Sequence, residues 1–456
     1  MEVRYHTLCG FFRSRAMDRA VPMREPEAGP PLVEDYHAQT ASERRIPSEI
    51  ILWDETLRDG EQMPGVRFSP EEKLAIAEKL SDVGVPLLNA GIPVVSPEEA
   101  RTVRRIAEAG LKARILAAGR TVPGDVEAII NSGVTHAAVF VAASQVHLKF
   151  KLRMTQDEVL EASVRSVRRL HEAGLHTAFV TEDTVRAPLD FVSRLYRAVQ
   201  QAGADRLVIA DTVGVMTPLT FRWFLREFRR RVQPRDWSVH CHNDFGLATA
   251  NTLTALEEGV QAPHVCVNGL GERAGNTSLE ELVMALEVLY GVRTGIQTDR
   301  LYELSQLVEE LSGVPIPPNK ALVGYNSFSH EAGIHTHGVL RHTLTYEPLQ
   351  PSRVGRQRRL ILGKHTGRAA LVEKLREEGL QANDEQLQRL LGLIKEESER
   401  GSKETQRALL GSYRAQFQNP GLGDEEFWRL AAKVGLVRRG EGSSAAPLSE
   451  VAGEGS

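Results

Sequence analysis

The sequence alternates eight times between a short apolar run and a longer amphipathic stretch, and this alternation limits the possible folds more than any other feature. Short apolar runs suit buried strands, and the stretches between them carry apolar residues at helical spacing. Strands that alternate with helices predict a parallel sheet, and eight such units close a TIM barrel. The expected strands are Ile50–Trp53, Pro86–Ala90, Ala113–Ala117, Ala137–Val141, Thr177–Thr181, Arg206–Ala210, Trp237–His240 and Val265–Val267.

Helix start signals support this alternation. The strings Ser69-Pro70-Glu71-Glu72 and Ser96-Pro97-Glu98-Glu99 each combine a serine N-cap, a first-turn proline and acidic residues. We therefore predict an α/β chain, in which a (β/α)8 TIM barrel is followed by a smaller, mainly helical C-terminal region. The expected barrel helices include Pro70–Ser81, Thr155–His171, Leu189–Gln201, Pro218–Val232, Leu247–Glu258 and Leu279–Leu289.

Changes in composition mark the expected boundaries around the barrel. Residues 1–46 carry several prolines and scattered charges without periodicity, which predicts a disordered leader, and a tail rich in Gly, Ser and Glu predicts disorder over 438–456. Between them we expect the barrel at 47–292, a linker helix and Pro-rich linker at 293–318, and a helical lid and dimerisation region at 319–437. That last region is expected to contain helices at Ala369–Glu377, Asp384–Ser398 and Lys403–Gln416.

Composition excludes several classes of protein. A net charge of −4 without clustered Lys and Arg gives no electrostatic footprint for a nucleic acid. No apolar run is long enough to span a membrane. Three cysteines cannot form a disulfide framework, and the N-terminus lacks the apolar segment of a secretion signal, so a cytoplasmic protein is expected.

Two histidines close the seventh expected strand, in the string His240-Cys241-His242-Asn243-Asp244. Alternate residues of a strand share one face, so His240 and His242 point the same way, about 7 Å apart along the chain. A lone histidine is usually a satisfied core residue. Two on one face at the C-terminal end of a barrel strand, where TIM barrels carry their chemistry, predict a shared metal ion.

Polar clusters also follow the first and eighth strands. The first is Asp54-Glu55-Thr56-Leu57-Arg58-Asp59-Gly60-Glu61-Gln62, and the second is the glycine-rich Asn268–Asn276. A capped loop and a simple turn are the ordinary alternatives for such strings. Two imidazoles and the Asp59 carboxylate suit Zn²⁺, Mn²⁺, Co²⁺ or Fe²⁺ with positions left open for substrate.

An open metal site of this kind suits a 2-oxo acid, which can offer a carboxylate and a keto oxygen. The metal would polarise the ketone, and Arg58 would neutralise charge that builds on its oxygen. A second reactant that attacks through carbon must first lose a proton, so a base is needed. The candidates are Glu182, at the end of the fifth strand, and His335, beyond the barrel.

Taken together, these strings resemble the homocitrate synthase and 2-isopropylmalate synthase family, the DRE-TIM metallolyases, most closely the homocitrate synthases of the nitrogen-fixation type. The resemblance covers about residues 50–370 in the order of the family. The strings that carry it are Thr56–Gln62, His147–Leu152, His240–Asn251, Asn268–Asn276, His330–His335 and Leu362–Gly367.

The resemblance implies an acetyl-CoA-dependent acyltransferase that joins the methyl carbon of acetyl-CoA to the ketone of a 2-oxo acid and releases CoA. It implies Mn²⁺, Mg²⁺, Zn²⁺ or Co²⁺ as the metal, and a homodimer whose active site is completed by the other subunit. The implied metal ligands are Asp59, His240, His242 and Asn276. The implied catalytic residues are Arg58, Glu182, His335 and Tyr346, and substrate contacts are expected at Gln62, Asn89, His147, Ala178 and Thr212.

Two departures bear on the choice of 2-oxo acid. The family usually carries a Glu where this chain has Asn89, and its loss would remove a negative charge from the pocket. Some homocitrate synthases place an Arg where Ala178 stands, to bind the distal carboxylate of 2-oxoglutarate. We expect homocitrate synthase-like chemistry on 2-oxoglutarate, with 2-isopropylmalate, citramalate and phosphonomethylmalate synthase as alternatives.

Three other readings differ in chemistry. Hydroxymethylglutaryl-CoA lyases share the metal cluster but use a Cys in the glycine loop, which reads Leu270-Gly-Glu-Arg-Ala here. Biotin-dependent carboxyltransferases need a lysine that becomes carboxylated, and we identify none. A non-catalytic regulatory barrel is the alternative from another class, but such proteins usually lose a ligand or the base, and this chain has both.

Overall fold

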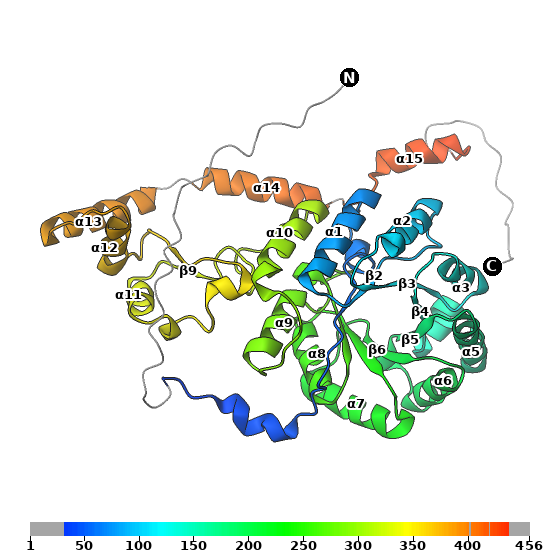
Figure 1. Ribbon diagram of the computed structural model, residues 1–456. Coiled ribbons are helices and arrows are strands. Elements are labelled where there is room, and N and C mark those ends of the chain that lie inside the picture. Colours follow the sequence, from blue (N-terminus) through cyan, green and yellow to red (C-terminus); the bar gives the residue numbers. More distant parts are fainter. Residues whose placement is uncertain (1–31, 401–402, 419, 437–456) are drawn as a thin grey trace. The chain divides into compact units, whose positions relative to one another are not determined.

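The computed structural model describes residues 32–400, 403–418 and 420–436 (Figure 1). The chain divides into two units, Met1–Ala41 and Ser42–Ser456. The described part of the expected leader contains a 3-10 helix, η1, at Tyr36–Glu43. The rest of the leader, residues 1–31, and the whole of the expected tail, 438–456, lie outside the described residues.

Eight parallel strands form a closed barrel, which confirms the predicted TIM barrel. The barrel closes because β1 pairs with β2 on one side and with β8 on the other. The last strand lies earlier than the expected Val265–Val267 and ends at Val265, since Asn268 takes a left-handed conformation inside a 3-10 turn, η5, at Val267–Gly269. The strands are β1 Trp53–Asp54, β2 Leu87–Asn89, β3 Arg114–Arg120, β4 His136–Ala142, β5 His176–Glu182, β6 Arg206–Asp211, β7 Trp237–Cys241 and β8 Ala262–Val265.

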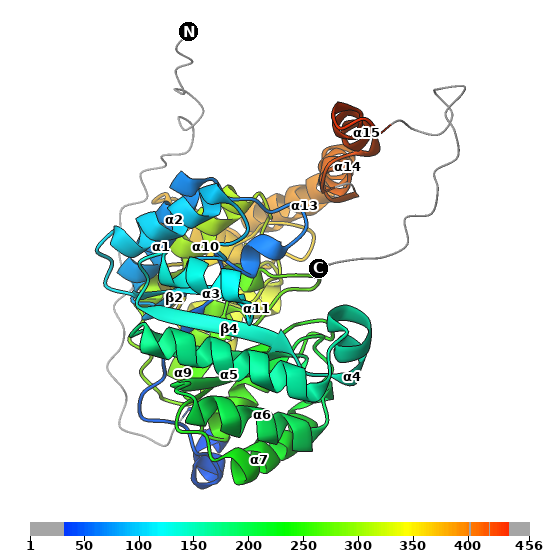
Figure 2. The ribbon, with the colours of Figure 1, turned by 90° about the vertical axis from the view of Figure 1, so that its right-hand side faces the viewer.

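Helices surround the strands, and Figure 2 shows α5 next to β4, with α6 on the other side of α5. Both predicted serine caps are present: Ser69 forms a capping box with Glu72, and Ser96 accepts a hydrogen bond from the backbone N–H of Glu99. The barrel helices are α1 Pro70–Val83, α2 Pro97–Glu108, α3 Pro123–Ile130, α5 Gln156–Glu172, α6 Leu189–Gln201, α7 Pro218–Val232, α8 Ala248–Glu257 and α9 Leu279–Val288.

Two apolar clusters make the core. The larger lies between the strands and the helices, and the smaller fills the inside of the barrel around the fully buried Trp53. Ala118, Ala138 and Ala178 share this inner cluster. Small residues opposite one large ring let the side chains of successive strands interdigitate, so the barrel interior is a packed core.

After the barrel, α10 (Leu301–Ser312) packs against α1 and buries Leu304 and Val308. A two-stranded parallel sheet, β9 (Ser329–His330) with β10 (Arg359–Leu360), then precedes the remaining helices. The sheet was not expected, because two-residue strands carry no readable alternation. The helices are α11 Gly333–Arg341, α12 Arg368–Glu377, α13 Asp384–Arg400, α14 Glu404–Gln418 and α15 Asp424–Lys433, which confirms a mainly helical C-terminal region.

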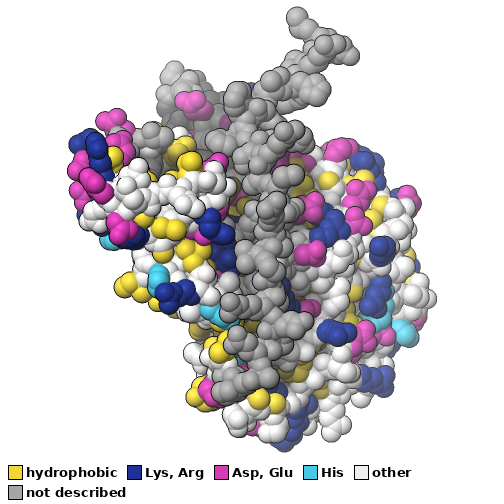
Figure 3. Space-filling view, turned by 60° about the vertical axis from the view of Figure 1, so that its left-hand side comes forward, with side chains coloured by type: hydrophobic (Ala, Val, Ile, Leu, Met, Phe, Trp, Pro, Cys, Tyr) yellow, Lys and Arg dark blue, Asp and Glu magenta, His cyan; other side chains and the backbone are white. Residues whose placement is uncertain are grey.

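Charged side chains of both signs are interspersed on the face shown in Figure 3. Among the helices that the structure describes, none has the length and apolar character needed to cross a membrane.

Candidate active site

The carboxyl ends of β1, β7 and β8 bring the predicted metal ligands together. The Nε2 atoms of His240 and His242 lie 3.1 Å apart, and the Oδ2 atom of Asp59 lies 3.1 Å from the first and 3.6 Å from the second. One ligand atom from each residue lies within 4.8 Å of the others, and all three residues are buried. Asn276 joins this group, since its Nδ2 donates to Asp59 Oδ2 at 2.7 Å.

The charge states of this cluster favour a cation. Burial, together with neighbouring His240, lowers the pKa of His242 to about 3, so this imidazole is neutral and has a lone pair to offer. Burial alone would raise the pKa of Asp59, but Arg58 and the hydrogen bond from His240 hold it well below its usual range. The side-chain oxygen of Asn276 is buried without a hydrogen-bond partner among the described residues. Two imidazoles, one carboxylate and one unused amide oxygen fit a divalent metal ion.

Two buried residues behind the cluster, His264 and Glu55, hold His240 in place. The Nδ1 atom of His240 lies 3.3 Å from Nδ1 of His264, which in turn lies 3.5 Å from Oε1 of Glu55. Metal-binding histidines usually have their second nitrogen held in this way, which fixes the orientation of the ring. His264 was missed by the sequence analysis, although it sits in the last strand beside Trp53. Glu55 is part of the first polar string, but the sequence analysis predicted no role for it.

Asn89 does not leave the pocket short of a negative charge, so that expectation is wrong. Its Nδ2 donates to both oxygens of Glu55, at 2.9 and 3.2 Å, and Glu55 also binds Nε of Arg58 at 2.6 Å. Glu55 lines the cavity described below. The carboxylate of the pocket is therefore that of Glu55, which follows β1, and not one at position 89 in β2. Asn89 donates hydrogen bonds to this carboxylate.

We expect Asn89→Asp to destabilise the protein in a pH-dependent way. The new carboxylate would lie about 3 Å from that of Glu55 with no amide proton to donate, which costs about 3 kcal/mol. Because a protonated carboxyl can donate to Glu55, the loss should be larger at pH 8 than at pH 5. Urea denaturation of variant and wild type at both pH values measures it. An equal loss at the two pH values would contradict the charge-pair explanation.

A cavity of about 240 Å³ lies above the metal cluster. It brings together most of the residues that the sequence predicted: Arg58, Asp59, Gln62, Glu182, Thr212, His240 and His242. One wall is apolar and consists of Trp53, Ile92, Ala118, Phe140, Val180 and Ala210. Asn89 and Ala178 are buried outside this lining. The lining of the cavity therefore combines charged and apolar side chains.

Glu182 lies across the cavity at the end of β5. The Nζ atom of Lys151 binds both of its carboxylate oxygens at 2.7 Å. Lys151 belongs to a π-helical turn, η3 (Leu148–Leu152), that follows the short helix α4 (Gln145–His147). Such turns often mark functional sites. Lys151 was missed because a single lysine in a loop carries no signal of its own.

His147 lies close to this pair. Its Nδ1 atom is buried without a hydrogen-bond partner among the described residues, 3.7 Å from Asp183 and 3.9 Å from Glu182. Thr212 accepts a hydrogen bond from the backbone N–H of Asp183 at 2.8 Å. The expected substrate contacts His147 and Thr212 thus lie near each other around the end of β5.

His335 and Tyr346 lie beyond the barrel, in α11 and next to a 3-10 turn, η7 (Thr343–Thr345). Their rings are 4.4 Å apart between centroids, and both side chains are exposed. The described residues that line the 240 Å³ cavity do not include them. Next to Tyr346, the buried carboxylate of Glu347 binds Arg358 at 2.6 and 2.5 Å and His330 at 3.1 Å, which fixes this segment.

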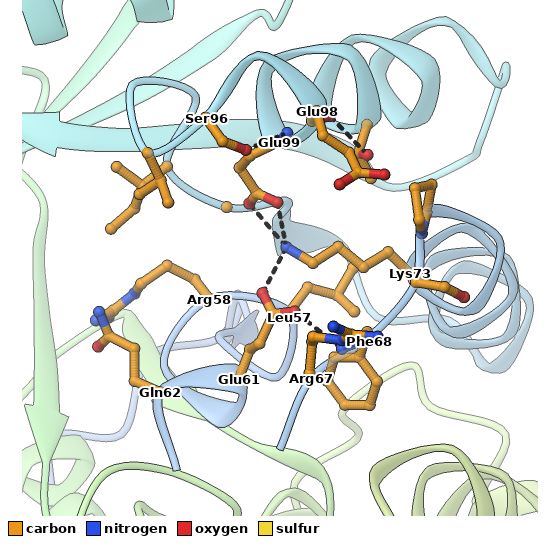
Figure 4. A pocket seen from close by; sticks show the side chains of 16 residues that line it. Leu57, Arg58, Glu61, Gln62, Arg67, Phe68, Lys73, Ser96, Glu98 and Glu99 are labelled. Atoms are coloured by element: carbon orange, nitrogen blue, oxygen red, sulfur yellow. Dashed lines mark hydrogen bonds and ion pairs between the residues drawn. The ribbon is translucent and has the colours of Figure 1, made fainter. Parts of the chain in front are cut away.

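A second cavity, of about 580 Å³, adjoins the first (Figure 4). The two share Arg58, Gln62 and Ile92. The larger cavity extends along the loop after β1 and the start of α2, between charged side chains of both signs. A large ligand in the second cavity could therefore reach Arg58 while a separate, smaller ligand occupies the first cavity, above the metal cluster.

Two family models match two successive parts of the chain. A family model described as HMGL-like matches residues 49–308, which is more than half of the chain. A model described as a homocitrate synthase post-HMGL domain-like region matches residues 322–402. The two matches correspond to the barrel with α10 and to the region that carries His335 and Tyr346.

Curated relatives extend along most of the chain. Homocitrate synthase AksA of Methanopyrus kandleri is 49% identical over 79% of this chain and 90% of its own length. A probable 2-isopropylmalate synthase of Ignicoccus hospitalis is 46% identical over 79% and 90%. A putative (R)-citramalate synthase CimA of Methanopyrus kandleri is 47% identical over 79% and 71%. Among solved structures, an HMG-CoA lyase of Bacillus subtilis has a TM-score of 0.55 and covers 60% of this chain and 96% of its own. At 23% identity, this similarity is one of fold.

Proposed function

This chain belongs to the HMGL-like family, among its homocitrate and 2-isopropylmalate synthases, and we propose on that premise that it condenses acetyl-CoA with 2-oxoglutarate to give homocitrate and CoA. It is an acetyl-CoA-dependent acyltransferase, as the synthases of that family are, and the family depends on a divalent metal. The observation that carries the proposal is the convergence of Asp59, His240 and His242 on the floor of a cavity that also holds Arg58 and Glu182.

The reaction needs a proton acceptor, a group that stabilises negative charge and a proton donor. The bound metal would polarise the ketone of the 2-oxo acid. Glu182 accepts a proton from the methyl carbon of acetyl-CoA, and that carbon forms a bond to the keto carbon. The guanidinium of Arg58 faces the oxygen on which charge develops, and this oxygen then takes a proton to become a hydroxyl. Water finally cleaves the thioester, which gives a carboxylate and the CoA thiol.

The two cavities offer a place for each substrate. We place the 2-oxo acid in the 240 Å³ cavity over the metal cluster and the acyl arm of acetyl-CoA in the 580 Å³ cavity. The shared residues Arg58 and Gln62 support this arrangement, because the reacting carbons have to meet where the cavities join.

Charged groups in the smaller cavity support 2-oxoglutarate as the acceptor. Lys151 and Arg273 line it, paired with Glu182 and Asp244 respectively, and a distal carboxylate would be a second anionic partner for one of these cations. The apolar wall formed by Ile92, Phe140 and Val180 instead favours a short apolar side chain, as in pyruvate or 2-oxoisovalerate. A citramalate or 2-isopropylmalate synthase is therefore the second candidate.

We further propose a homodimer in which His335 and Tyr346 of one subunit complete the site of the other. Their exposure and their absence from the described lining of the chain's own 240 Å³ cavity support this arrangement. Paired in this way, the two residues would supply the proton to the new hydroxyl. Free, buried Cys241 and Cys266 are compatible with the cytoplasm that we propose as its location.

The proposal is tested by thiol titration of CoA released from acetyl-CoA. We expect release with 2-oxoglutarate in the presence of Mn²⁺ or Mg²⁺, its loss with EDTA and its return when the metal is added back. A panel with pyruvate, 2-oxoisovalerate, oxaloacetate and phosphonopyruvate identifies the acceptor. Faster turnover of pyruvate would establish the second candidate, and no release with any acid would refute the condensation.

A further inference from the structure

Lys73 is a buried lysine that joins three segments beside the metal cluster. Its side chain, in α1, is only 2% exposed. Its Nζ atom lies 2.7 Å from Glu61 Oε2, and 2.7 and 2.8 Å from the two oxygens of Glu99 (Figure 4). Lysine is almost never fully buried unless it is paired. The three residues, the Lys73 cluster, link the loop after β1 to α1 and α2.

Glu61 connects this cluster to the metal-binding loop. It belongs to the 3-10 turn η2 (Gly60–Gln62), which directly follows Asp59. While one carboxylate oxygen binds Lys73, the other accepts the backbone N–H of Phe68 at 3.0 Å. The backbone N–H of Asp59 donates to the carbonyl of Glu55 at 2.8 Å, so the turn is held from both ends.

Glu99 holds Lys73 from the opposite side. Its carboxylate fits against Gly91, where a Cβ would lie 1.9 Å from Oε1 of Glu99. Gly91 also has a φ of +137°, so a side chain at that position would be both strained and obstructed. Burial raises the pKa of Glu99 despite the neighbouring ammonium. Without the lysine, two carboxylates would face each other with no cation between them.

We propose that Lys73 is a positioning residue for the metal site: it holds Glu61, and through Glu61 it fixes the turn that begins directly after Asp59 and contains Gln62. The inference rests on the proposed metal site and goes beyond it, because Lys73 contacts neither the metal cluster nor the 240 Å³ cavity among the described residues. Groups that orient a metal ligand typically change metal affinity by about 10- to 100-fold when they are removed.

The test measures Mn²⁺ affinity by titration calorimetry together with thermal unfolding. We expect Lys73→Met to weaken Mn²⁺ binding by about 10- to 100-fold. Because Lys73 acts through Glu61, adding Glu61→Gln to that variant should weaken binding no further. The matched control is Arg206→Met, which breaks another buried ion pair, with Asp236 at 2.6 Å, at the start of β6. This control should lower the unfolding temperature and leave Mn²⁺ affinity within about twofold.

The outcomes separate this inference from the metal assignment. If the wild type binds no Mn²⁺, both fail. If the wild type binds Mn²⁺ and Lys73→Met binds it within about twofold while unfolding earlier, the lysine is merely structural and the inference fails. If Lys73→Met does not fold, the single variant Glu61→Gln is the test, because the side chain of Glu61 is partly exposed and its replacement should be tolerated. Weaker Mn²⁺ binding by Glu61→Gln supports the inference, and unchanged binding overturns it.

Discussion

Replacing His240 with alanine is expected to remove nearly all metal-dependent CoA release. The variant loses one of the three convergent ligands, and with it the partner of Asp59 at 3.1 Å. A metal ion contributes several kcal/mol to stabilising developing charge, which at about 1.4 kcal/mol per tenfold corresponds to about a 1,000-fold lower rate. Thiol titration measures the rate, and calorimetry with Mn²⁺ measures the loss of binding.

His176→Ala is the matched control for that variant. His176 is also a strand histidine, but it stands at the start of β5, where its ring stacks on His136 at 4.8 Å between centroids. The starts of the strands lie at the opposite end of the barrel from the cluster. The control should therefore keep both Mn²⁺ binding and activity. Equal activity in the two variants would refute the assignment of the metal site.

Replacing Glu182 with glutamine is expected to stop the chemistry while leaving the metal in place. Glutamine keeps the shape of the side chain but cannot accept a proton from carbon, and loss of a general base costs about 100- to 10,000-fold in kcat. Glu182 lines the cavity with the three convergent ligands but is not one of them. Mn²⁺ affinity should therefore stay within about twofold of the wild type.

Two measurements make this prediction specific. Exchange of the acetyl methyl protons into deuterated water should be lost together with kcat, because both need the same proton transfer. Glu272→Gln is the control, since Glu272 is a second carboxylate in the lining of the same cavity. It should retain most of the activity. A Glu182→Gln variant with wild-type kcat would show that another group is the base.

The barrel and the types of residue at its mouth could be predicted from the amino-acid sequence alone. Periodicity is a local property, so alternating strands and helices could be read directly, and α6 and α7 begin and end at the expected residues. The pair His240 and His242 could be recognised because a strand repeats every two residues. Caps such as Ser69 with Glu72 are equally local, since both partners lie within one helical turn.

How these residues are supported could be seen only in the folded chain. Asn276 and Asp59 are 217 residues apart in the chain, and Asn89 and Glu55 are 34 apart, so no local pattern pairs them. The same holds for Lys151 with Glu182 and for Lys73 with Glu99. A charge or hydrogen-bond partner depends on atoms a few ångströms apart in space. The carboxylate of Glu55 beside Asn89 could therefore be recognised only in the closed barrel, where the two side chains are hydrogen-bonded.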